Sequence, residues 1–216
     1  MNFTSMREAL TSLSRSNAGV ASAVLLSMAI SVALWTVFPD IDDENHLLEW
    51  LQALFLTLAC TVHGVRAWQE GDRQSLRFLM HAGMSALLFG FLLRELDIDQ
   101  FGTAPAWAQA EKTLRVMELL ILIRLLVFFA PRARRVFAVA PQIFSMRVTI
   151  LTAIGGLRMV AGWPFDKKVF HGMPDAYALL GEEVLELGAY LLLFLASLSD
   201  SAAAARISLA PTKKPA

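Results

Sequence analysis

The chain has 216 residues, of which 56% are hydrophobic and 18% charged, and its basic and acidic residues balance to zero net charge. A mean hydropathy of +0.53 excludes an ordinary soluble domain, and the single cysteine, Cys60, excludes an internal disulfide. The composition therefore favours one integral membrane domain.

Apolar stretches about 20 residues long, the length that crosses roughly 30 Å of hydrocarbon, recur along the chain. They predict an all-α membrane bundle with six transmembrane helices, at residues 17–38, 47–67, 78–96, 113–130, 143–162 and 176–198. The domain at 17–198 follows a cytoplasmic segment, 1–16, in which apolar residues at helical spacing predict an amphipathic helix on the membrane surface. We expect the tail, 199–216, to be cytoplasmic and disordered at its end.

The basic residues between the predicted spans set the orientation, because Lys and Arg accumulate on the cytoplasmic side. One side holds Arg7, Arg15, Arg66, Arg73, Arg77, Arg132, Arg134, Arg135, Arg147, Arg206, Lys213 and Lys214. The other side holds Lys112, Lys167 and Lys168. We therefore expect both termini in the cytoplasm. Since topology accounts for the basic residues, we do not expect nucleic-acid binding.

Carboxylates and arginines also lie inside the predicted spans, mostly toward the outer ends. An ionisable side chain costs on the order of 2.5–3.5 kcal/mol at the centre of a bilayer, so such groups normally face one another within a bundle. The carboxylates are Glu49, Glu95, Glu118, Glu182, Glu183 and Glu186, and the arginines near them are Arg94, Arg115 and Arg158. Because the acids outnumber the arginines, a divalent cation, bound protons or a cationic substrate would balance the charge.

Helical spacing places several of these residues on common faces, at i, i+3, i+4 or i+7. The groups are Asn45, Glu49 and Gln52 in the second predicted span, Glu111, Arg115 and Glu118 in the fourth, and Glu182, Glu183 and Glu186 in the sixth. We predict that they form one acidic, arginine-braced polar site in the outer half of the bundle. A structural ion-pair network, in which Arg115 and Glu118 satisfy each other, is the alternative.

Each residue of the predicted site has an expected role. The acid–base or catalytic residues are Glu183, Glu186, Glu49 and Glu95, and the residues expected to hold an anionic headgroup are Arg94, Arg115, Arg158, Asn45 and Gln52. The expected ligands of a divalent metal ion are Glu182, Glu186, Glu118, Asp97 and His171.

Two further histidines, His63 and His81, lie near the cytoplasmic ends of the second and third predicted spans. A short loop makes these spans antiparallel neighbours, and facing imidazoles at one depth are an arrangement that can ligate a b-type haem. The outer side has no second histidine pair for transmembrane electron transfer. We therefore expect packing or a hydrogen bond between the two helices rather than haem.

Short patterns along the chain resemble those of uncharacterised small multi-pass bacterial inner-membrane proteins. They are Glu44-Asn45 with Glu49-Trp50, Arg94-Glu95-Leu96-Asp97, and Glu182-Glu183 with Glu186-Leu187 and Ala189-Tyr190. The chain is also similar, remotely, to the alkaline ceramidase-like superfamily of membrane metal hydrolases, at Asp43, Glu44, Asn45, Glu49, His81 and Asp97. It departs from that superfamily on the last helix, where Glu182 and Glu186 replace the H-x-x-x-H zinc pair.

These patterns lead to one expected function and two alternatives. We expect a bacterial inner-membrane protein whose polar site, with a divalent metal ion, hydrolyses or transfers a lipid or lipid-linked substrate. The first alternative is a proton- or cation-coupled transporter or binding subunit, and the second is a structural subunit of a membrane complex. Soluble-enzyme motifs such as a glycine-rich phosphate loop or H-E-x-x-H are missing from the sequence.

Overall fold

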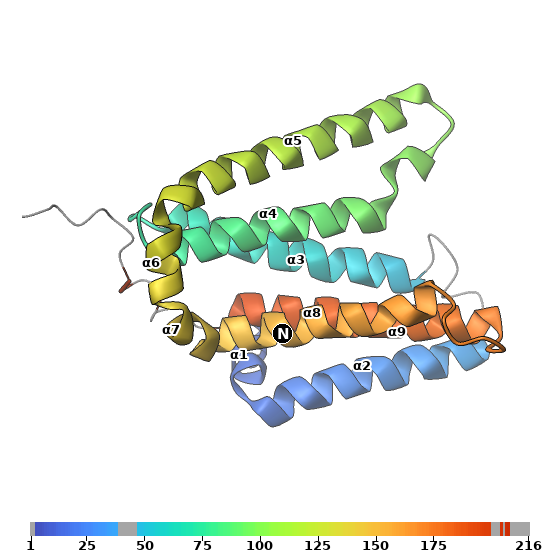
Figure 1. Ribbon diagram of the computed structural model, residues 1–216. Coiled ribbons are helices and arrows are strands. Elements are labelled where there is room, and N and C mark those ends of the chain that lie inside the picture. The colour runs from blue at the N-terminus through green and yellow to red at the C-terminus, as the bar shows by residue number, and fades with distance from the viewer. Residues whose placement is uncertain (1–2, 39–46, 200–203, 205, 208–216) are drawn as a thin grey trace, which may run out of the picture. The chain divides into compact units, whose positions relative to one another are not determined.

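The computed structural model describes residues 3–38, 47–199, 204 and 206–207. Over these residues the protein is all-helical and contains no strand (Figure 1). The chain forms two compact units, the first made of Met1–Ala59 and Ile150–Ser199 and the second of Cys60–Thr149 and Asp200–Ala216. The predicted all-α class is therefore confirmed.

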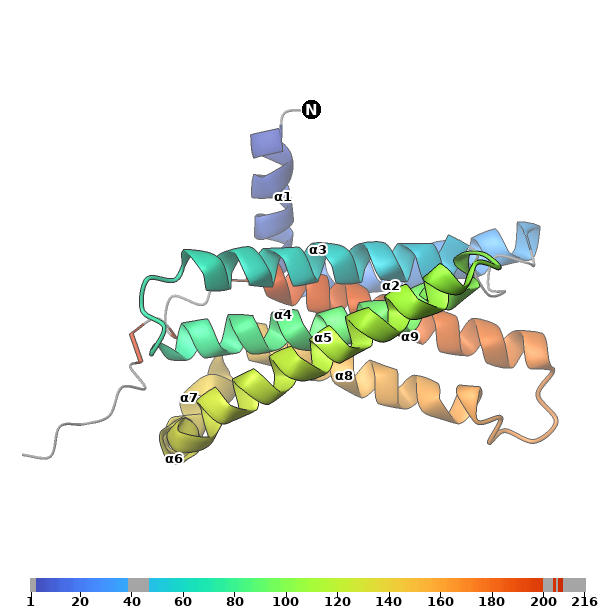
Figure 2. The same cartoon turned by 90° about the horizontal axis from the view of Figure 1, so that it is seen from above.

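The first unit is built around one buried helix, α9 (Asp175–Leu198). It also contains α1 (Phe3–Arg15), α2 (Asn17–Val37), the first part of α3 (Leu47–Gln69) and most of α8 (Arg147–Asp166). Helix α9 packs along α2, and both helices also contact α1. Figure 2 shows that α1 runs crosswise to these two helices.

Local sequence signals fix the ends of the helices in the first unit. The Ser16 side chain accepts a hydrogen bond from the Gly19 backbone N–H at 3.1 Å, which caps the start of α2. Helix α9 begins after Pro174 with Asp175 in its first turn, where a carboxylate interacts favourably with the helix dipole. Its apolar face packs with α3 in a buried cluster that contains Leu48, Leu180, Val184 and Leu187.

The second unit is centred on a pair of antiparallel helices, α4 and α5 (Figure 1). Its elements are the rest of α3, α4 (Leu76–Leu96), η2 (Ile98–Phe101), α5 (Pro105–Phe129), η3 (Ala130–Arg132), α6 (Ala133–Ala138) and α7 (Ala140–Ser145). Ser75 caps α4 by accepting a hydrogen bond from the Phe78 N–H at 3.0 Å. Helices α3 and α4 meet where the Cys60 thiol donates to the Ser85 carbonyl at 3.3 Å.

Four of the described helices, α2, α3, α4 and α8, are long and apolar enough to cross a membrane. Helix α5 has no buried residue, and its exposed side chains include Leu119, Leu120, Ile123, Leu126 and Val127. Exposed apolar surface on this scale is typical of contact with lipid or with another protein. The four apolar helices are therefore compatible with a multi-pass membrane protein.

Two predicted helix starts differ from the structure. The fifth span was predicted from residue 143, but α7 ends at Ser145 and the extended backbone of Met146 (φ −73°, ψ 135°) separates it from α8. This prediction was wrong because hydropathy detects an apolar run and not a backbone break inside it. The fourth span was predicted from residue 113, whereas α5 begins at Pro105, which occupies a first-turn position that suits proline.

Candidate polar site

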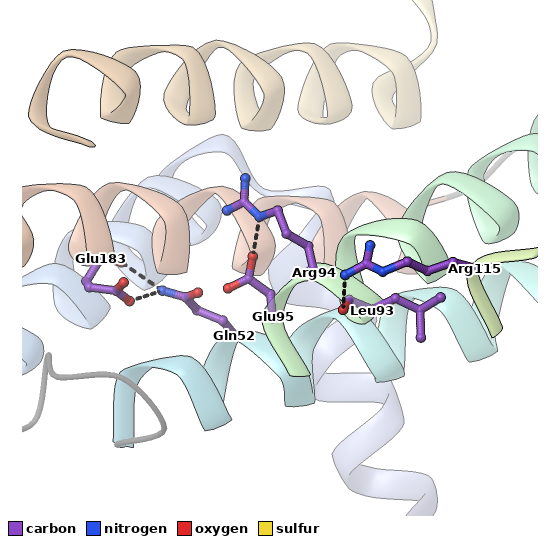
Figure 3. A network of polar contacts seen from close by, with 6 residues as sticks. All are labelled: Gln52, Leu93, Arg94, Glu95, Arg115 and Glu183. Carbon is purple, nitrogen blue, oxygen red and sulfur yellow. Dashed lines mark hydrogen bonds and ion pairs between the residues drawn. The ribbon is translucent and has the colours of Figure 1, made fainter. Parts of the chain in front are cut away.

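The first unit buries a hydrogen-bonded pair made by Gln52 of α3 and Glu183 of α9. The Gln52 amide nitrogen donates to Glu183 Oε2 at 2.6 Å and to the Glu183 carbonyl oxygen at 3.3 Å (Figure 3). Gln52 is 0% exposed and Glu183 8% exposed. The Gln52 Oε1 atom is buried and accepts no hydrogen bond from a described residue. Two residues expected in the site are thus brought together, and one acceptor is left open.

Glu186 lies one helical turn beyond Glu183 on α9 and is 7% exposed. It faces α8, because a Cβ added at Gly162 would lie 3.9 Å from Glu186 Cγ. Glu182 is half-buried, and the same Cβ would lie 3.9 Å from its carbonyl oxygen. The interface of α8 with α9 therefore places a buried carboxylate beside a glycine.

Arg158 of α8 enters the same interface. A Cβ added at Gly188 of α9 would lie 2.5 Å from Arg158 Nη2 and 2.9 Å from its Nε, so the guanidinium lies directly over the glycine. Its Nη2 donates to Met28 Sδ at 3.3 Å, whereas its buried Nε has no partner among the described residues. Arg158 forms no ion pair with any described residue, although a guanidinium is always charged. Sequence reasoning missed Gly188 and Met28, because neither residue type carries chemistry of its own.

In the second unit, Arg94 and Glu95 at the end of α4 form an ion pair. Arg94 Nε lies 2.9 Å from Glu95 Oε1 (Figure 3), and the side chains are 51% and 6% exposed. Asp97 follows with a positive φ of 33° and caps the end of α4. Its carbonyl oxygen accepts a hydrogen bond from the Gln100 N–H at 2.8 Å. These residues thus have defined local structural roles.

Arg115 of α5 pairs with Glu111 and not with Glu118. Its Nε lies 2.7 Å from Glu111 Oε1, and its Nη2 donates to the Leu93 carbonyl at 3.5 Å (Figure 3). Glu111 Oε2 also accepts a hydrogen bond from the Asp99 N–H at 3.1 Å. The hydrogen bond from Arg115 is the main cause that lowers the pKa of Glu111, and the bond from Asp99 adds to it. The alternative pairing of Arg115 with Glu118 was therefore wrong.

Glu118 instead packs against Gly90 of α4. A Cβ added at Gly90 would overlap Glu118 Oε1, so the glycine makes room for the carboxylate. Within the described part of the chain, Glu118 forms no hydrogen bond or ion pair. The spacing of Glu111, Arg115 and Glu118 allowed either pairing, and the contact with α4 selected one.

The remaining residues of the predicted site are Asn45, Glu49 and His171. Asn45 lies outside the described residues. Glu49 is half-buried in the first turn of α3, and His171 is exposed between α8 and α9. The gathering of Glu49, Glu95, Glu118 and Glu186 into one cavity stays a prediction, as do the assigned metal ligands. Among the described residues no three His, Cys, Asp or Glu side chains are grouped to hold a metal ion.

His63 of α3 and His81 of α4 are in direct contact, as expected for facing imidazoles on neighbouring helices. Their Nδ1 atoms lie 2.7 Å apart and both residues are 1% exposed. An iron held between these two atoms would require the rings to move apart. His81, which the resemblance to membrane hydrolases grouped with Asp97, lies at the opposite end of α4 from it.

Comparison with other proteins finds no matching family model, no matching curated protein and no matching solved structure. In chemical terms, the first unit offers a charged donor, Arg158, that has no acidic partner among the described residues, together with two buried carboxylates on the neighbouring helix. This combination suits an anionic group that also requires acid–base chemistry.

Proposed function

We propose that this protein is a bacterial inner-membrane enzyme that hydrolyses or transfers an anionic lipid or lipid-linked substrate at the interface of α8 and α9. The observation that carries the proposal is the guanidinium of Arg158, which lies over Gly188 without an ion-pair partner among the described residues. Arg158 is half-buried and its Nε is buried without a partner among the described residues, which is costly for a charged group, whereas a bound phosphate or carboxylate would form charge-assisted hydrogen bonds with it.

The proposed topology has six spans, with both termini on the cytoplasmic side. Helix α9 carries three glutamates, but Glu183 and Glu186 are buried, so surrounding helices would shield them from lipid. Helix α5 exposes an apolar surface that suits the bilayer. The crosswise direction of α1 to α2 suits a helix that lies on the membrane surface (Figure 2).

Contacts within the second unit support a cytoplasmic C-terminus. The Ile207 carbonyl of the tail accepts a hydrogen bond from the Leu76 N–H at 2.9 Å, at the start of α4. At the same end, Arg132 Nε donates to Gln74 Oε1 at 2.9 Å. These contacts bring the tail and two basic connecting segments together, as the positive-inside rule requires.

The proposed mechanism uses residues of the first unit. Arg158 binds the negative charge of the substrate, and Glu186 on the neighbouring helix accepts a proton from water as the water oxygen bonds to the ester centre. The ester bond then breaks, and the proton passes to the leaving alcohol. Gln52 holds Glu183 in place beside the reacting group through the 2.6 Å hydrogen bond. In the metal-dependent form of this proposal, the candidate ligands within the first unit are Glu182, Glu186 and His171.

Lipid binding tests the proposed anion site. The protein is placed in nanodiscs of phosphatidylcholine that contain phosphatidylglycerol as the anionic probe. We expect phosphatidylglycerol to raise the melting temperature of the protein, and Arg158→Gln to weaken this binding about tenfold or more, the value of a charge-assisted hydrogen bond. Arg124→Gln is the matched control, because Arg124 is an exposed arginine of α5. Equal binding by Arg158→Gln and the unaltered protein would contradict the anion site.

Glu186→Gln tests the chemistry separately from binding. With radiolabelled membrane lipids as substrate, we expect the variant to retain phosphatidylglycerol binding and to lose lipid hydrolysis or transfer. Retained turnover would contradict the assigned role.

A second candidate is a proton- or cation-coupled transporter, which the burial of both Glu183 and Glu186 favours. Here the same variant should abolish pH-dependent flux in vesicles while lipid turnover is absent in both proteins.

A further inference from the structure

A shallow pocket of about 380 Å³ opens at the start of α5 in the second unit. Asp99 of η2 and the α5 residues Glu111, Lys112, Arg115, Val116 and Leu119 line it. It lies in a different unit from the Arg158 interface, and the proposed enzyme mechanism does not use it. Its volume falls within the range of small-molecule sites in proteins.

The charged part of the pocket is held in place by hydrogen bonds. Glu111 accepts from Arg115 Nε at 2.7 Å and from the Asp99 backbone N–H at 3.1 Å, so the carboxylate joins α5 to η2. Lys112 is exposed and forms no ion pair with a described residue. The pocket therefore presents two cations beside two carboxylates, and one of the cations, Lys112, has no ion-pair partner in the part of the chain that the structure describes.

The other part of the pocket is apolar. Val116 and Leu119 follow Lys112 along α5 and are 49% and 56% exposed. Because a helix rises 1.5 Å per residue, they lie roughly 6 and 10 Å further along the axis than Lys112. If α5 crosses the bilayer as proposed, the charged part lies at the headgroup level and the apolar part beside the acyl chains.

We propose that this pocket binds a zwitterionic aminophospholipid, with an ethanolamine-type headgroup, from the outer leaflet. The lipid phosphate lies between Lys112 and Arg115, its ammonium group lies against Asp99 and Glu111, and an acyl chain follows Val116 and Leu119. Arg115 already pairs with Glu111, so a headgroup with a single negative charge and no amine would place its charge near the Asp99 carboxylate without supplying a cation for it. The inference rests on the proposed crossing by α5 but not on the activity at Arg158.

Native mass spectrometry of the full chain, released from phosphatidylcholine nanodiscs that contain equal amounts of phosphatidylethanolamine and phosphatidylglycerol, tests the site. We expect one phosphatidylethanolamine to remain bound, and both Lys112→Gln and Asp99→Asn to weaken its binding about fivefold, as expected for exposed charge pairs. Lys167→Gln, at another exposed lysine on the same proposed side, should have no effect. Arg158→Gln should also leave this adduct unchanged, which separates the result from the enzyme proposal.

Three results would overturn the inference. The first is an equal retention of phosphatidylglycerol by the Arg158→Gln variant, in which the proposed anion site of the first unit is removed, because this would show that the carboxylates of the pocket do not select an amine. The second is an adduct that survives both pocket variants, and the third is the absence of a retained lipid from the unaltered protein.

Discussion

The Nδ1 atoms of His63 and His81 lie 2.7 Å apart in the interior of the second unit. One imidazole must donate its Nδ1–H while the other accepts, so the two rings carry different tautomers. We expect His63→Phe to lower the free energy of unfolding by about 1–3 kcal/mol, because the partner ring loses this hydrogen bond. Denaturation of single and double variants in detergent micelles measures the coupling. Additive losses from His63→Phe and His81→Phe would contradict a direct interaction.

The contact of Glu118 with Gly90 predicts a specific steric effect. Gly90→Ala places a methyl group where Glu118 Oε1 lies, and we expect a loss of about 1–3 kcal/mol in stability. Gly83→Ala on the same helix is the control, because nothing lies within 4 Å of its added Cβ. The control should be neutral or stabilising, since alanine favours a helix. Adding Glu118→Ala should recover most of the loss at Gly90, and a failure of this rescue would contradict the packing.

Gly188→Ala should displace the guanidinium of Arg158, because the new Cβ would lie 2.5 Å from Nη2. The end of an arginine side chain moves at little cost, so we expect a small change in stability. Binding of phosphatidylglycerol, measured by the shift in melting temperature, should nevertheless weaken about tenfold as the charge-assisted contacts are lost. Gly156→Ala, whose added Cβ meets nothing within 4 Å, should bind normally. Normal binding by Gly188→Ala would show that the position of Arg158 is unimportant.

Gln52 should contribute more to stability than its polarity suggests. Gln52→Leu removes the donor 2.6 Å from a buried carboxylate of Glu183, and we expect a loss of about 1.5–3 kcal/mol. The exposed amide of Gln100, which donates to Asp97 Oδ2 at 3.4 Å, is the control. Gln100→Leu should change the free energy of unfolding by less than about 0.5 kcal/mol. Equal effects of the two changes would contradict the importance of the buried pair.

The ion pair of Glu111 with Arg115 predicts a pH effect. The lowered pKa of Glu111 means that its contribution to stability is present above the ordinary value of 4.5 and is lost as the pH falls through the folded-state value. We expect Arg115→Gln to bring the pKa of Glu111 back toward its ordinary value, because the largest cause of the shift is removed. Infrared titration of isotope-labelled glutamate measures this change. A pKa that stays low in the variant would assign the shift to the Asp99 backbone.

Much of the helical framework was predictable from the sequence. Helices α2, α3 and α9 begin within one residue of their predicted starts, because apolar runs and residues such as Ser16 act locally. The break at Met146 was not predicted, because a window of hydropathy averages Ser145 and Arg147 with the apolar residues on either side of them. The first turns of α5, before residue 113, were missed because they contain polar residues, and a hydropathy pattern detects only the apolar part of a helix.

The candidate site was predictable as a set of residues but not as a set of contacts. The sequence by itself determined that acids and arginines lie within long helices, and the cost of charge in a bilayer then required partners for them. Only the tertiary structure decided that Arg115 forms an ion pair with Glu111, that Glu183 accepts a hydrogen bond from Gln52 and that Arg158 lies over a glycine. Spacing along a helix allows several pairings of equal distance, and the choice among them depends on which side chain or glycine the neighbouring helix presents.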